Sequence, residues 1–134
     1  MTFDFRLIRM INRIHRFHGH ASLRYAYQHG QTVRGPLVSL KYVVNARRQT
    51  YRLAVVVSKK ISKSAVVRNR IRRRLYESVR LQEANFDQSY DLIITVFHEQ
   101  VATMPADELT RMVVAQFRQA AILPPKSSLS HGKI

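Results

Sequence analysis

The sequence predicts one domain of the α+β class, and three observations support this prediction. Two segments of β-branched and aromatic residues have the composition of strands, and a third strongly apolar run occurs much later in the chain. Two longer segments repeat their apolar residues with the period of a helix. The chain of 134 residues has the size of one ordinary domain, and no repeat or internal linker divides it.

A short helix is predicted over residues 20–29, after a basic and irregular N-terminal segment. Leu23, Ala26 and Tyr27 fall on one face of this helix. Gly30 stands at the position where a C-terminal cap is expected.

Two strands are predicted next. Gly35 and Pro36 form a turn into the first, which covers residues 37–45, and a polar turn leads to the second, which covers residues 51–58. Since only that turn separates the two strands, we expect them to pair with each other as a hairpin.

The longest regular segment is a helix predicted over residues 64–83. At about 100° per residue, its core positions fall within an arc of about 120°. Four arginines point away from this arc, interrupted only by Glu77, and Arg68 and Arg72 lie at its margin. The core positions are Val67, Ile71, Leu75, Ser78, Val79 and Gln82, and the outward arginines are Arg70, Arg73, Arg74 and Arg80.

A strongly apolar strand is predicted over residues 90–97, followed by a last helix. Pro105 opens this helix at the favoured first position, and Asp107 and Glu108 complement the helix dipole. Pro124 and Pro125 mark its end. Its inner stripe comprises Leu109, Met112, Val113, Gln116, Phe117 and Ala120.

The predicted domain covers residues 12–123. Residues 1–11 form an N-terminal extension and residues 124–134 a C-terminal tail, and we expect both to be disordered. Met10 is an alternative start to Met1, in which case the extension is not needed.

Charge is concentrated in the first part of the chain. The whole sequence has 23 Lys and Arg against 8 Asp and Glu, a formal charge of +15. Residues 1–80 hold 19 of the basic and 2 of the acidic residues. Arginine predominates, with 17 residues against 6 lysines, and its guanidinium binds phosphate at two points and stacks on bases. This distribution favours a nucleic-acid partner over a merely anionic membrane.

Other classes of protein are excluded by composition. The chain has no cysteine, and therefore no disulfide framework, thiolate zinc site or thiol nucleophile. No apolar run is long enough to span a bilayer, and Asp4, Arg6 and Arg9 interrupt any signal-peptide core. We therefore expect a cytoplasmic protein without a membrane partner.

The segment between Lys59 and Arg80 carries nine basic residues and one acidic residue. A basic run is usually a solvated helix face, but such faces mix charges of both signs in i,i+4 pairs, and here only Glu77 is available. Unpaired guanidinium groups on one rigid face repel each other unless phosphates lie between them. Because no DNA-binding module has its signature here, and a basic helix on a small sheet suits structured RNA, RNA is the favoured partner.

The same segment resembles the signature of the bacterial ribonuclease P protein family. It runs Leu-Ala-Val-Val-Val-Ser-Lys-Lys from Leu53 and then Ala-Val-Val-Arg-Asn-Arg-Ile-Arg-Arg from Ala65. The Arg-Asn-Arg block after Ser-Lys-Lys is far more specific than a generic basic helix. The resemblance covers about residues 12–122, including Tyr-Gln-His-Gly at residues 27–30 and Tyr-Asp-Leu-Ile-Ile at residues 90–94.

The resemblance implies a fold and a function. The fold is a single-domain α/β sandwich, ribosomal protein S5 domain 2-like. Its small, mixed four-stranded sheet packs with the long basic helix, with N- and C-terminal helices flanking it and a left-handed crossover through the basic helix. The function is that of the protein subunit of ribonuclease P, a monomer present once per catalytic RNA. That enzyme removes the 5′ leader of precursor tRNA, and its RNA performs the hydrolysis with Mg²⁺, so the protein itself has no catalytic residue, metal or cofactor.

The resemblance also implies two binding surfaces. The basic helix and the lysines before it contact the catalytic RNA, and a cleft between the first helix and the sheet binds the single-stranded leader. The residues implied for the catalytic RNA are Lys59, Lys60, Arg68, Asn69, Arg70, Arg72, Arg73 and Arg74, and those implied for the leader are Leu23, Tyr27, Ser39 and Lys41.

This chain departs from the family in the leader cleft. The family commonly has aromatic residues where this chain has Leu23 and Lys41, which leaves Tyr27 as the stacking platform. Leader binding is therefore expected to depend more on charge. A strand register shifted by one residue places Tyr42 in the cleft instead, and the sequence leaves both registers open.

Three histidines, His15, His18 and His20, suggest a metal site, but without cysteine or a nearby carboxylate they are interpreted as surface or RNA-facing residues. His98 and Glu99 suggest acid–base catalysis, but adjacent residues point apart, and we interpret them as loop.

Two other functions stay open at this stage. A ribosomal or RNA-assembly protein with a similar basic α/β domain shares the composition, and the Arg-Asn-Arg block is what argues against it. A self-sufficient nuclease needs clustered carboxylates for a metal, and the basic part of the chain offers only Asp4 and Glu77.

Overall fold

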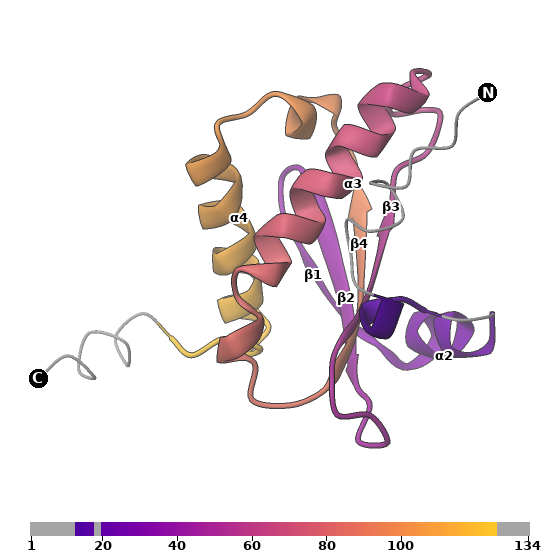
Figure 1. Ribbon diagram of the computed structural model, residues 1–134, viewed down its shortest axis with the longest axis vertical. Helices are drawn as coiled ribbons and strands as arrows, with labels where there is room; N and C mark the ends of the chain where they lie inside the picture. Colours follow the sequence, from indigo (N-terminus) through magenta and orange to yellow (C-terminus); the bar gives the residue numbers. More distant parts are fainter. Residues whose placement is uncertain (1–12, 18–19, 126–134) are drawn as a thin grey trace, which may run out of the picture.

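The computed structural model describes residues 13–17 and 20–125 (Figure 1). The predicted N-terminal extension lies outside the described residues, as does nearly all of the predicted tail. The elements, in chain order, are η1 (Arg13–His15), α2 (Ala21–His29), β1 (Gln31–Arg34), β2 (Val38–Val44), β3 (Arg52–Val56), α3 (Ala65–Arg80), η2 (Glu83–Asn85), β4 (Tyr90–Val96), η3 (Glu99–Ala102) and α4 (Ala106–Gln119).

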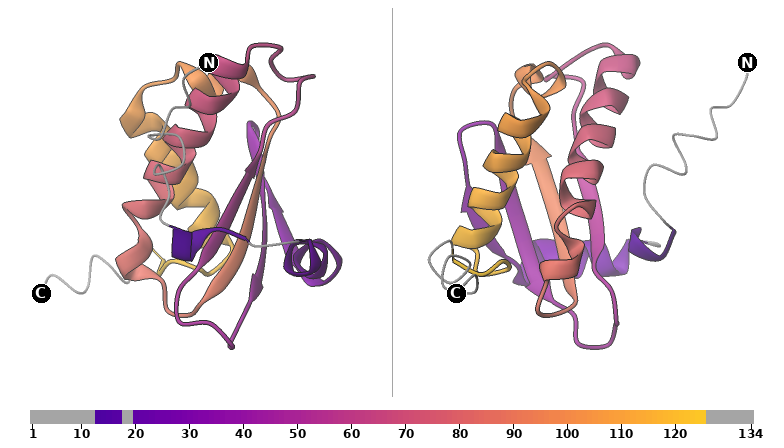
Figure 2. Two further views of the ribbon diagram at one scale, coloured as in Figure 1. Left: turned by 45° about the vertical axis from the view of Figure 1, so that its right-hand side comes forward. Right: turned by 60° about the vertical axis from the view of Figure 1, so that its left-hand side comes forward.

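These elements form three layers. The helices α3 and α4 lie side by side on one face of the sheet, and α2 lies on the opposite face (Figure 2). Strand β1 escaped the sequence analysis because it has four residues and one partly buried apolar side chain, Val33. The prediction of an α+β domain with a small mixed sheet is confirmed.

The strand order is β1-β2-β4-β3, and it corrects one prediction. The two strands expected to form a hairpin, β2 and β3, do not pair, because β4 lies between them. Strand β4 is antiparallel to β2 and parallel to β3. The physical reason is that six of the seven residues of β4 are buried, and a strand that is apolar on both faces is most stable in the interior of a sheet.

The crossover from β3 through α3 to β4 is left-handed, as the family resemblance implied. With α3 in front and both strands pointing upward, the chain moves from β3 to β4 on its left (Figure 1). Parallel connections are right-handed in about 98% of cases. Helix α3 therefore packs over the side of the sheet that contains β4 and the edge strand β3.

The core lies between the sheet and the two helices that cover it. Five of the six core positions predicted for α3 are confirmed: Ile71, Leu75, Ser78 and Val79 are buried, and Val67 is partly buried and packs against the core. The sixth, Gln82, is partly buried beyond the end of the helix. The inner stripe of α4 is confirmed as well, because Leu109, Val113, Gln116, Phe117 and Ala120 are buried. The outward face of α3 carries its arginines, with Val66 as an exposed apolar side chain in the first turn.

Helix α2 approaches the sheet closely. Its one buried residue is Ala26, and Ile93 is buried on the sheet face that α2 covers. Gly30 caps the helix as predicted, donating its N–H to the Ala26 carbonyl oxygen, but its φ of −74° is open to any residue. Glycine is needed for space, because an added Cβ would lie 2.5 Å from that oxygen and 2.8 Å from Cγ of Lys41.

The segment just before α2 is more ordered than its sequence suggested. The ring of His15 stacks on Tyr51 with centroids 4.0 Å apart, and its Nδ1 donates a 2.9 Å hydrogen bond to the Tyr51 carbonyl oxygen. The Phe17 ring lies 4.9 Å from the guanidinium carbon of Arg52. Residues 13–17 thus pack against the edge strand β3 and its first flanking residue, Tyr51.

Candidate nucleic-acid interface

The N-terminus of helix α3 has a capping side chain but no acidic residue near its positive dipole. Ser64 accepts a 3.2 Å hydrogen bond from the N–H of Val67, which satisfies one of the free donors of the first turn. The first turn contains no acidic residue, so the positive end of the helix dipole is not neutralised there. This end of α3 follows directly on the turn that carries Lys59 and Lys60.

The outward stripe of α3 divides into two halves. In the half nearer the N-terminus, Arg70 and Arg73 are exposed, and neither forms a hydrogen bond or ion pair with a described residue. In the other half, Arg80 donates to both carboxylate oxygens of Glu77, at 2.9 and 2.6 Å. That bond holds the pKa of Glu77 below its usual value. The uncompensated charge of the stripe therefore lies in its N-terminal half.

Three further residues of the Arg-Asn-Arg block and its neighbours are partly buried. Arg68 donates a 2.9 Å hydrogen bond to the carbonyl oxygen of Ser62, and Arg72 donates a 3.0 Å hydrogen bond to Oδ1 of Asn69. Each bond uses one of the five N–H donors of a guanidinium group. These arginines are thus held in place by the protein while most of their donors stay available.

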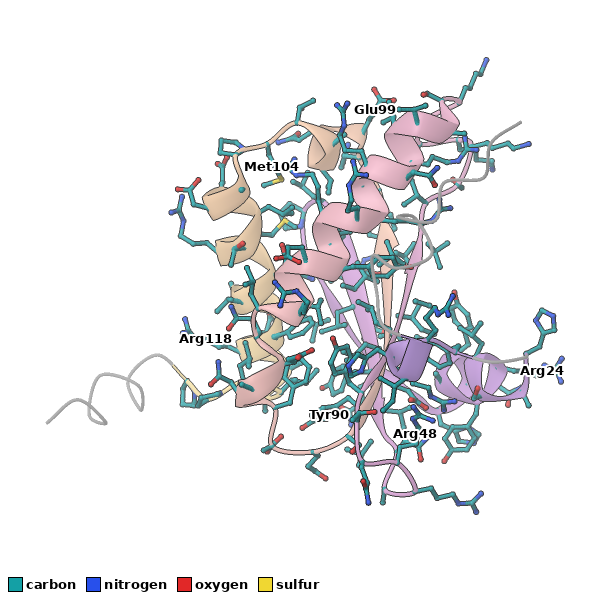
Figure 3. The ribbon with its side chains drawn as sticks, viewed as in Figure 1. Arg24, Arg48, Tyr90, Glu99, Met104 and Arg118 are labelled. Carbon is teal, nitrogen blue, oxygen red and sulfur yellow. The ribbon has the colours of Figure 1, made fainter. Side chains whose placement is uncertain are left out.

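Arg74 corrects the prediction that it points to solvent. Its Nη1 donates a 2.8 Å hydrogen bond to the carbonyl oxygen of Val101, and its Nη2 donates to that of Met104. Figure 3 shows Met104 between α3 and the start of α4. Arg74 is partly buried and joins α3 to the segment around η3. This role could not be predicted from the helical pattern, because the carbonyl groups of Val101 and Met104 reach Arg74 only through the tertiary fold.

Lys59 and Lys60 lie where the sequence predicted them, in the turn that follows β3. Both are exposed, and so is Lys63, which the sequence analysis did not single out. The turn is closed by hydrogen bonds from the N–H groups of Ile61 and Ser62 to the Ser58 carbonyl oxygen. Among the described residues, none forms a hydrogen bond or ion pair with the three lysine ammonium groups. Together with Arg70 and Arg73 they form the basic end, a name used below for these five residues.

The predicted cleft brings Tyr27 and Lys41 together. Lys41 Nζ donates a 2.9 Å hydrogen bond to the Tyr27 carbonyl oxygen and lies 5.9 Å from the centre of the Tyr27 ring. The Tyr27 residue is 46% exposed. Tyr42 packs against the core on the opposite face, and its hydroxyl donates to Oε1 of Gln31. The register that the sequence left open is therefore the one with Lys41 in the cleft.

The other two predicted leader residues flank this pair. Ser39 is partly buried and shares the face of Lys41, two residues along β2, and it is paired with Arg34 on β1 and Thr95 on β4. Leu23 is partly buried on α2. Arg34 was missed because β1 was missed; it is exposed and its guanidinium lies 5.4 Å from the centre of the Phe97 ring.

The suggested metal and acid–base sites gain no support from the geometry. Of the three histidines, His15 is engaged with Tyr51, and His18 lies outside the described residues. Within residues 13–17 and 20–125, no three His, Cys, Asp or Glu side chains gather where they could hold a metal ion. His98 is exposed and precedes η3, and Glu99 is exposed in its first turn.

Comparison with known sequences gives a consistent result. Residues 11–121 match the family model described as Ribonuclease P. The chain is 36% identical over 114 residues to the ribonuclease P protein component of Chloroflexus aurantiacus, which covers 85% of this chain and 83% of that protein. It is 40% identical over 82 residues to the one from Clostridium kluyveri, covering 60% and 71% of the two chains.

Solved structures share the fold. The RNase P protein of Staphylococcus aureus matches with a TM-score of 0.71 at 21% identity, covering 81% of this chain and 97% of that one. The RNase P protein of Thermotoga maritima matches with a TM-score of 0.68 at 14% identity, covering 78% and 96%. With the sequence match over residues 11–121 and the Arg-Asn-Arg helix in the expected place, this chain belongs to the ribonuclease P protein family.

Proposed function

We propose that this chain, as the protein subunit of ribonuclease P, binds the catalytic RNA with one surface and the 5′ leader of precursor tRNA with another. The first surface is the basic end together with Arg68, Asn69 and Arg72, and Arg74 supports it from within the fold. The second is the surface beside α2 formed by Tyr27 and Lys41. Removal of the leader then gives the mature 5′ end of tRNA.

The observation that carries the first half of this proposal is the unequal pairing of charges along α3. Arg80 has a carboxylate partner within the protein, whereas Arg70 and Arg73 have none among the described residues. Three exposed lysines before the helix add to the same field. Repulsion among these groups is relieved when phosphates lie between them, and a rigid helix fits the backbone of a structured RNA.

The second half rests on the geometry around Lys41. Its ammonium group is held by the Tyr27 carbonyl oxygen, so that a positive charge and an exposed aromatic ring lie at fixed positions next to each other. A base can stack on the ring while the neighbouring phosphate lies near the ammonium group. This combination suits a single strand better than a duplex, whose bases are already stacked.

We further propose that the hydrolysis is performed by the RNA with Mg²⁺, and that the protein acts as a monomer in the cytoplasm, one copy per RNA. Two carboxylates that could serve a nuclease are already engaged: Glu77 with Arg80, and Asp91 with Arg52 in a buried pair. No helix among the described residues is long and apolar enough to cross a membrane. Sequencing of the RNA that copurifies with the chain tests the RNA partner directly.

The experiment that tests this function is reconstitution with and without the catalytic RNA. The protein alone should leave precursor tRNA uncut, and the complex should cleave at the mature 5′ end. Tyr27→Ala should weaken binding of substrates with a leader of several nucleotides by about 1–3 kcal/mol, since it removes one stacking surface. Mature tRNA, which has no leader, is the control and should bind unchanged. Equal weakening of both ligands, or cleavage by RNA-free protein, would contradict the proposal.

A further inference from the structure

A recess lies between α2 and the turn that joins β2 to β3. It has a volume of about 520 Å³, and Tyr25, Asn45, Arg47, Arg52 and Asp91 are among the residues that line it. Tyr25 precedes Tyr27 by two residues, which places the two side chains about 200° apart around the helix. The pocket is thus on the other flank of α2 from Tyr27 and Lys41, on the same face of the sheet.

The floor of the pocket is polar and fixed. Arg52 donates from Nε and Nη2 to the two carboxylate oxygens of Asp91, at 2.9 and 2.8 Å, and Asn45 Nδ2 donates to the same carboxylate at 3.1 Å. Arg52 and Asp91 are 8% and 2% exposed. Because the carboxylate is fully compensated, it does not repel an approaching phosphate, and the floor offers polar groups at defined positions.

The rim supplies an aromatic ring and a positive charge. Tyr25 is 51% exposed, and His29 stacks on it with centroids 4.1 Å apart and an interplanar angle of 22°, which fixes the ring. Arg47 is exposed, and its guanidinium forms no hydrogen bond or ion pair with a described residue. The charges of Arg52 and Asp91 cancel, so the net charge of the side chains that line the pocket is +1.

We propose that this pocket binds one nucleotide of the single-stranded leader, farther along the strand than the part held by Tyr27 and Lys41. The base stacks on Tyr25, its edge meets the polar floor, and a phosphate lies near Arg47. A pocket of about 520 Å³ is within the range of small-ligand sites and large enough for one nucleotide. The inference rests on the proposed function, since it extends the same strand past α2. The opposite face of the sheet carries α3, so the catalytic RNA is the less suitable occupant.

The test compares Tyr25→Leu and Arg47→Gln with wild type in the complex with the catalytic RNA. Binding is measured for mature tRNA and for substrates whose leaders are lengthened one nucleotide at a time. Tyr25→Leu keeps an apolar side chain but removes the ring, and Arg24→Gln is the matched control for Arg47→Gln. Arg24 is an exposed arginine that points outward from α2 (Figure 3).

Both pocket variants should match wild type for mature tRNA and short leaders and then bind more weakly once the leader is long enough to reach past α2. For Tyr25→Leu the loss should be about 5- to 150-fold, the equivalent of one lost stack. Arg24→Gln should match wild type at every length. Tyr27→Ala should show its loss at a shorter leader than Tyr25→Leu, which places the two sites in order along the strand.

Three outcomes overturn the inference in distinguishable ways. If the pocket variants match wild type at every length while Tyr27→Ala does not, the proposed function stands and the pocket holds no leader nucleotide. If they weaken assembly with the catalytic RNA whatever the leader, the occupant is a nucleotide of that RNA. If wild-type binding does not depend on leader length at all, the proposed leader function itself fails.

Discussion

The division of charge along α3 leads to a quantitative prediction for the double variant Arg70→Gln, Arg73→Gln. These are the two arginines of the outward stripe that have no partner among the described residues. If each contacts one phosphate, the plot of log K against log salt concentration should lose about 1.4–1.8 from its slope. The binding defect should then grow by about 25- to 60-fold when the salt concentration falls from 1 M to 0.1 M.

The assay is a titration of the catalytic RNA with protein at four or five salt concentrations. The fold should survive, because both side chains are exposed and the buried face of α3 is unchanged. Arg111→Gln is the matched control: it removes an exposed arginine from α4, where Asp107 accepts a 3.1 Å hydrogen bond from it. The control should leave the slope unchanged. A folded double variant with the wild-type slope would refute the assignment of this helix face to RNA.

Three further predictions concern the groups that hold the fold together. Arg74→Met should lower the free energy of unfolding by about 1–3 kcal/mol, because two carbonyl groups lose their charged donor. The control Arg73→Met should change it by less than about 0.5 kcal/mol. Urea titration measures both values. Asp91→Asn should cost about 3–5 kcal/mol in the same assay, since it leaves the buried guanidinium of Arg52 without a countercharge, and a loss below 1 kcal/mol would show that the pair is well solvated. Burial, and then a hydrogen bond to a carboxylate, raises the pKa of Tyr90 to about 12 and that of Tyr51 further. Their unfolded pKa is about 10, so the stability that these two tyrosines contribute should be fully present below pH 10 and be lost as the pH rises above it. Tyr90→Phe should therefore flatten the fall in urea midpoints measured between pH 9 and 11.

Local pattern predicted the long elements closely because each of them is set by its own residues. The predicted helix over residues 20–29 differs from α2 by one residue, and α3 begins one residue after the predicted start at residue 64 and ends three residues before the predicted end at residue 83. The predicted strand over residues 90–97 is β4 with one residue more. In each case the periodicity of apolar residues and a clear boundary residue agree with the tertiary packing.

Strand pairing could not be obtained in the same way. Whether β2 pairs with β3 or with β4 depends on which strand is buried on both faces, and the partners Lys41 and Ile93 are far apart in the chain. A short turn between two strands favours a hairpin, but the apolar β4 competes for the same edge and displaces β3. The mixed sheet and the left-handed crossover were expected only from the family resemblance.

The site shows the same limit at the level of single side chains. A count of basic residues between Lys59 and Arg80 treats all nine alike, yet four of them form hydrogen bonds within the protein. Arg68, Arg72 and Arg74 donate to Ser62, to Asn69 and to the segment around η3, and Arg80 is paired with Glu77.

The remaining five residues, those of the basic end, are exposed and unpaired within the described chain. The three lysines precede the N-terminus of α3, where the helix dipole is also positive, and Arg70 and Arg73 follow in its second and third turns. The positive charge available to RNA therefore comes mainly from these five residues and not from the whole basic segment. It follows that charge removal at Arg70 or Arg73 should alter the salt dependence of RNA binding, whereas removal at Arg74 should alter the stability of the protein first. Measuring both quantities for the same variants separates the part of the basic helix that binds RNA from the part that keeps it in place.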